Sequence, residues 1–81
     1  MQSTNVRTVA EIGEEIRRTW RNPYFGAVPY IGALCAIETL DAPYGYDDPR
    51  GIVRYFLANA STFRGPDAKR LRAELKKAAG V

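Results

Sequence analysis

Histidine is absent from the 81 residues, and cysteine occurs once, at Cys35. Without histidine the chain cannot form a Ser-His-Asp or Cys-His catalytic arrangement or a histidine-based zinc site, and a single cysteine cannot supply a four-cysteine zinc site. Any general base would have to be a carboxylate, a tyrosine or a lysine with a shifted pKa. We therefore expect a protein that is not an enzyme and that holds neither a metal nor a cofactor.

Long apolar runs are also missing. No stretch approaches the roughly 18 apolar residues of a membrane-spanning helix, and the N-terminus lacks a secretory apolar region. The most apolar segment, residues 33–37, ends at Glu38 and contains Cys35. The sequence thus predicts a protein of the cytoplasm that does not associate with membranes, with a buried, reduced thiol at Cys35.

The prolines that are present divide the chain into helices. Proline fits the first turn of a helix, disrupts its interior and pushes the preceding residue out of the helical region. The informative pairs are Asn22-Pro23, Val28-Pro29, Asp48-Pro49 and Gly65-Pro66. They predict an all-α protein, a bundle of four short helices over residues 8–21, 29–40, 49–60 and 66–79. Residues 1–7 are expected to form a flexible tail and residues 8–79 a single helical domain.

Local chemistry supports these helices. Thr8 and Glu11 have the spacing of a capping box, and Asp48 before Pro49 is typical of an N-cap. Residues 29–40 are apolar on more than one face, which predicts that this helix lies at the centre of the domain. Gly26, Gly32, Ala33 and Ala36 are small enough to allow close approach of another helix.

The positive charge is concentrated near the C-terminus, in residues 64–81. One interpretation is a solvated terminal helix whose cations suit its C-terminal end. The other is a small DNA-binding regulator, in which the helices 49–60 and 66–79 and the turn between them form a helix-turn-helix-like unit at residues 49–79. The nucleic-acid candidates are Arg64, Lys69, Arg70, Arg72, Lys76 and Lys77.

The nine aromatic residues all lie between residues 20 and 63, and some of them fall in predicted loops. Loop aromatics can plug the ends of a helical bundle, or they can stand exposed as anchors of a protein interface. The interface candidates are Tyr24, Phe25, Tyr44 and Tyr46. Their partner would be another protein or a second copy of the chain in a dimer.

Acidic residues gather in the loop before the third predicted helix. Glu38, Asp41 and Asp47 supply the oxygen ligands that hard cations take, but their spacing does not match an EF-hand. Asp48 is already explained as a helix cap. We expect no metal site here.

Three stretches resemble small helical proteins encoded by actinobacteriophages. They are residues 22–25 (NPYF), 40–46 (LDAPYGY) and 55–65 (YFLANASTFRG), followed by a helix rich in alanine, lysine and arginine that ends with Glu74-Leu75-Lys76. The resemblance covers about residues 8–77 and carries no functional residues with it. It implies a phage product made in the cytoplasm of an actinobacterial host. Such proteins often bind a host or phage macromolecule, which favours an interaction module, able to self-associate, over the DNA-binding alternative.

Overall fold

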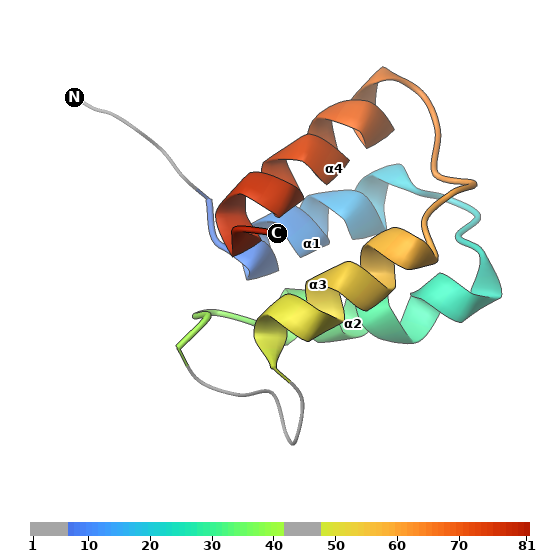
Figure 1. Cartoon of the computed structure of the whole chain (residues 1–81). Coiled ribbons are helices and arrows are strands. Elements are labelled where there is room, and N and C mark those ends of the chain that lie inside the picture. The colour runs from blue at the N-terminus through green and yellow to red at the C-terminus, as the bar shows by residue number, and fades with distance from the viewer. Residues whose placement is uncertain (1–6, 42–47) are drawn as a thin grey trace.

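The computed structural model describes residues 7–41 and 48–81, and this part of the chain forms four α-helices and no strand. A short 3-10 helix, η1 (Phe25–Ala27), leads directly into the second α-helix (Figure 1). The α-helices are α1 (Val9–Thr19), α2 (Val28–Ala36), α3 (Pro49–Ala58) and α4 (Pro66–Ala79). The all-α prediction is confirmed.

Successive helices run in opposite directions (Figure 1). Each packs against its neighbours in the chain, and α1 also packs against α4, so the four helices form a ring around one core. The connections 20–27 and 59–65 therefore lie at the same end of the bundle. We call this end, residues 16–31 and 55–70, the turn end.

The helix starts follow the predicted local chemistry. The Thr8 hydroxyl accepts a hydrogen bond from the Glu11 amide at 3.1 Å, and the Glu11 carboxylate accepts one from the Thr8 amide at 2.8 Å. The Asp48 carboxylate accepts from the amide of Arg50, with Pro49 as the first residue of α3. These caps satisfy amides that have no partner inside the helix.

Three helix ends differ from the prediction. α1 stops at Thr19, two residues early, because Trp20 turns into an extended conformation and buries its indole in the core. α2 begins at Val28 and stops at Ala36, four residues early. There Ile37 is extended and its carbonyl accepts from the Ala10 amide of α1 at 3.0 Å. α3 ends at residue 58, two residues early, and α4 has its predicted bounds.

The core is built from one apolar face of each helix, and no polar or charged side chain of the described residues is buried. α1 and α2 lie close together at Gly13, where an added Cβ would lie 2.9 Å from the Cβ of Leu34. Of the small residues of α2 that were expected to allow close approach, Ala33 is buried in the core, whereas Gly32 and Ala36 are exposed. Nothing lies within 4 Å of where a Cβ of Gly32 would be.

Two buried aromatic rings close the turn end. Trp20, after α1, stacks on Phe63, after α3, with ring centroids 4.8 Å apart and planes 20° apart. Phe56 also contacts the indole, in an edge-to-face arrangement with the ring centroids 6.2 Å apart. This stack ties the two connections together and positions the segment that follows Trp20.

Candidate protein-interaction surface

The outward side of α2 is apolar and exposed. Its residues Val28, Pro29, Gly32 and Ala36, which we call the α2 face, all contact solvent, and Val28 is 50% exposed. Every other α-helix of the described chain carries charged side chains, whereas α2 carries none. Because this helix has no polar side, packing Ile31 and Leu34 into the core leaves apolar residues facing water. The helix predicted to lie at the centre of the domain packs against α1 and α3 but leaves this side exposed.

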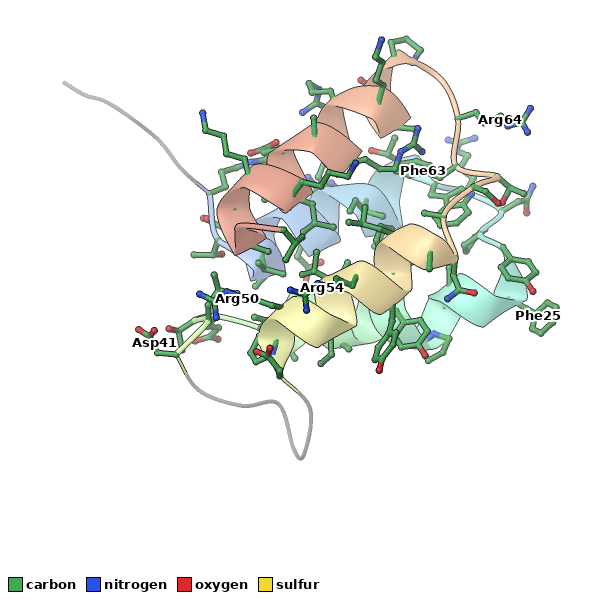
Figure 2. The ribbon with its side chains drawn as sticks, in the orientation of Figure 1. Phe25, Asp41, Arg50, Arg54, Phe63 and Arg64 are labelled. Atoms are coloured by element: carbon green, nitrogen blue, oxygen red, sulfur yellow. The ribbon has the colours of Figure 1, made fainter. Side chains whose placement is uncertain are left out.

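Two aromatic side chains extend this surface at the start of α2. Tyr24 is 44% exposed and Phe25 is 80% exposed, with ring centroids 4.8 Å apart. The Tyr24 ring lies over Gly26, where an added Cβ would be 2.6 Å from the ring. Phe25 points away from the bundle (Figure 2), so it does not plug the turn end. The other two interface candidates, Tyr44 and Tyr46, lie outside the described residues.

A hollow of about 230 Å³ lies between the end of α1 and the start of α2. A closed apolar cavity of about 150 Å³ is enough to bind benzene, so this hollow has room for one bulky apolar side chain. Its lining residues are Trp20, Pro23, Val28, Ile31, Gly32 and Arg17. Arg17 is the only one of them that carries a charge.

The edge that α1 forms beside the α2 face is charged. Arg17 donates to both carboxylate oxygens of Glu14, at 2.8 and 2.9 Å, and both side chains are exposed. These hydrogen bonds lower the pKa of Glu14. Arg18 and Arg21 follow, also exposed. The α3 edge is aromatic instead, with Tyr55 packed on Tyr30 at 5.8 Å.

Cys35 lies on the side of α2 that is next to Arg17 and Glu14 of α1. Its side chain was predicted to be buried but is only half-buried. Loss of solvent raises the pKa of its thiol, an effect that the Arg17 guanidinium partly offsets. The thiol therefore stays protonated at neutral pH, which makes it a weak nucleophile.

The fold gathers basic residues that are distant in the sequence. The turn end carries six cations against the single carboxylate of Asp67. The cations are Arg17, Arg18, Arg21, Arg64, Lys69 and Arg70. Half of them come from residues 16–31, a segment that the sequence did not mark as basic.

Two of the nucleic-acid candidates are engaged within the chain. Arg70 Nη2 lies 2.6 Å from Glu15 Oε2. Glu15 and Glu74 are also joined by Arg7, whose Nη1 is 2.7 Å from Glu15 Oε1 and whose Nη2 is 2.6 Å from Glu74 Oε1. Arg72 donates to the carbonyl oxygen of Phe63 in the turn before α4. Both guanidiniums thus hold helices together.

The remaining basic candidates are exposed but spread along α4. Arg64 and Lys69 lie at the turn end, while Lys76 and Lys77 occupy the last turn of the helix, about 10–12 Å beyond Lys69 at 1.5 Å per residue. The connection between α3 and α4 is residues 59–65, longer than the roughly three or four residues of a helix-turn-helix turn. The two helices run antiparallel (Figure 1).

Sequence reasoning missed Val28 and the rest of the α2 face, although a signal was present. Residues 22–37 contain no charged residue, and the part of this run from residue 29 onward was interpreted as a central helix. Among residues 7–41 and 48–81, no helix has the length and apolar character to cross a membrane, and no three metal-ligating side chains gather. Comparisons with protein-family models, with curated proteins and with solved structures give no match.

Proposed function

We propose that the chain is a non-enzymatic protein-interaction module that docks through the α2 face together with Tyr24 and Phe25. The observation that carries the proposal is the helix α2, which presents exposed apolar residues and no charge to solvent. Contiguous exposed apolar area on a small soluble domain is typical of interaction sites. The cores of protein interfaces are likewise poor in charge and rich in aromatic residues.

The chemistry of the hollow beside α2 supports a binding role over a catalytic one. Its only ionisable side chain is Arg17, which neither abstracts a proton nor attacks a substrate at neutral pH. The nearby Cys35 thiol is protonated. The hollow therefore suits an apolar side chain of a partner.

The DNA-binding alternative has less support. A nucleic-acid surface needs cations that follow the phosphates, and Arg70 and Arg72 already have partners within the chain. Lys69, Lys76 and Lys77 remain exposed on α4, so weak, salt-sensitive binding of duplex DNA is the most that this helix supports. The resemblance to actinobacteriophage proteins favours a host or phage protein as the partner.

The test is capture of partners from a lysate of an actinobacterial host, with and without nuclease treatment, by the immobilised chain and two variants. Val28→Asp places a charge on the α2 face. Ala73→Asp places the same charge at an exposed alanine of α4, a helix that does not adjoin α2. We expect partner proteins to be retained by the wild type and by Ala73→Asp and to be lost with Val28→Asp. Equal retention by both variants, or capture that nuclease abolishes, would contradict the proposal.

A further inference from the structure

Opposite charges lie at the two ends of the α2 face. Arg17 lines the hollow at the start of α2, and Arg21 lies in the connection between α1 and α2, which leads to that end of the helix. The other end of α2 lies beside the start of α1, as the bond from Ala10 to Ile37 shows. Glu38 and Asp41, both exposed, follow that end two and five residues after Ala36. Arg7 lines a hollow with Glu38, but it is already paired with Glu15 and Glu74. The apolar α2 face is therefore flanked in the chain by cations at one end and by carboxylates at the other.

We propose that two copies of this chain pair through their α2 faces, with the helices antiparallel and a two-fold axis near Gly32. A two-fold interface requires a surface that is complementary to itself, so that each contact occurs twice. In the antiparallel arrangement Arg21 of one copy faces the partner's Glu38, and the reverse contact repeats it. This inference rests on the proposed function and names a second copy as an occupant of the docking surface.

The middle of the α2 face suits such a contact. Gly32 is exposed, and the space where its Cβ would be is open, so a second helix can approach its backbone closely. Val28 lies one turn before Gly32 and Ala36 one turn after it. The larger side chain of each copy therefore meets the smaller one of the other. Such an alternation of large and small residues lets two helices interdigitate.

Charge disfavours the other arrangements. A parallel pair would place the Arg17 and Arg21 end of each copy against the same end of the other, and like charges in contact weaken association. A nucleic acid presents negative charge along its whole length, whereas this surface offers cations at one end and carboxylates at the other. Because α2 is only nine residues long, the shared area is expected at the low end of protein interfaces, below about 1,200 Å² in total. The dimer should therefore dissociate on dilution.

Sedimentation velocity over a wide range of protein concentration tests the pairing. We expect the mass of the wild type to rise with concentration from one copy to two. Gly32→Glu fills open space on a helix and leaves the fold intact, which circular dichroism checks, but it places a charge on the two-fold axis and should keep the chain monomeric. Arg54→Glu, on the exposed side of α3 (Figure 2), is the control and should dimerise like the wild type.

A charge exchange tests the orientation. Arg21→Glu sets a carboxylate against the partner's Glu38, and Glu38→Lys sets an ammonium group against the partner's Arg21, so each variant alone should dimerise severalfold more weakly. An equimolar mixture of the two should recover the association, because opposite charges then meet at both ends. A wild type that stays monomeric at all concentrations, a dimer that survives Gly32→Glu, or a mixture no stronger than its components would overturn the inference. Loss of lysate partners with Val28→Asp would in that case still support the proposed function.

Discussion

The Arg72 guanidinium of α4 donates to the carbonyl oxygen of Phe63, in the connection that precedes its own helix. The same Nη1 lies 3.5 Å from the carbonyl of Ala60, where α3 has just ended. A single cation thus satisfies carbonyls left without helical partners and fixes α4 against the end of α3. Its role in this structure is to close the turn.

Arg72→Ala should lower the free energy of unfolding by about 1–2 kcal/mol, because part-buried carbonyl groups lose a charge-assisted hydrogen bond. Arg72→Lys should recover part of this loss, since an ammonium group can reach one carbonyl. Urea denaturation gives the measurement, and the exposed Lys76→Ala on the same helix is the control. Equal midpoints for Arg72→Ala and Lys76→Ala would show that the contact contributes nothing.

Two glycine-to-alanine changes should have opposite effects. At Gly13 the new Cβ would lie 2.9 Å from Leu34 Cβ and 3.1 Å from the backbone of the facing helix. The new Cβ would force α1 and α2 apart. Gly13→Ala should therefore lower the free energy of unfolding by about 1–3 kcal/mol, despite the better helix propensity of alanine. At Gly51 the nearest atom is 3.9 Å away, so Gly51→Ala should stabilise α3 by about 0.5–1 kcal/mol.

Thermal unfolding of the two variants beside the wild type measures the difference. The melting temperature should fall for Gly13→Ala and rise for Gly51→Ala. A rise for both would mean that helix propensity, and not the distance between α1 and α2, limits stability at Gly13.

The cluster of Arg7, Glu15, Arg70 and Glu74 should make stability depend on acid pH. Hydrogen bonds from Arg70 and Arg7 lower the pKa of Glu15, and a hydrogen bond from Arg7 lowers the pKa of Glu74. The unfolded chain then binds more protons than the folded one below the ordinary carboxyl value of 4.5. The stabilisation that the two carboxylates provide is therefore complete above pH 4.5. It is lost as the pH falls through their lowered pKa values in the folded state.

Glu74→Gln removes one of these carboxylates and should flatten the acid limb of the stability curve. Urea midpoints measured from neutral pH downward should start lower for the variant and then fall less steeply than those of the wild type. Arg7→Ala should show the same flattening and should lower the free energy of unfolding by about 1 kcal/mol at neutral pH. Parallel curves for wild type and Glu74→Gln would assign the acid sensitivity to other groups.

Phe63→Leu should lower the free energy of unfolding by about 1–2 kcal/mol, although leucine nearly fills the space that the phenylalanine ring occupies. The ring is 3% exposed and stacks on Trp20, and an aromatic pair contributes beyond the apolar area that it buries. Urea denaturation gives the value. Phe25→Leu is the matched control, because that ring is 80% exposed, and it should leave the midpoint unchanged. A similar loss at both positions would argue against the stack.

Local chemistry was enough to predict where helices start. Thr8 and Asp48 cap their helices as the sequence indicated, and Pro66 begins α4 at its predicted position. The ends of α1 and α2 depend on contacts between distant segments instead. Trp20 leaves the helix to reach Phe63, and the Ile37 carbonyl pairs with α1, so neither event is visible in a local pattern.

The candidate surface was predictable only in part. Tyr24 and Phe25 were named because they lie outside regular helices, and the structure places both at the surface. Val28 and Gly32 were assigned to a central helix, because an apolar helix does not indicate which of its sides its neighbours will cover. The engagement of Arg70 depends on Glu15, which is 55 residues away in the sequence.

Trp20 is the only tryptophan of the chain, and it both closes the turn end and lines the hollow beside α2. Its intrinsic fluorescence is therefore a built-in optical reporter of this corner of the molecule. Unfolding, a ligand in the hollow or a neighbour over α2 would each change the surroundings of the same indole. Titrations can follow its emission without any attached dye.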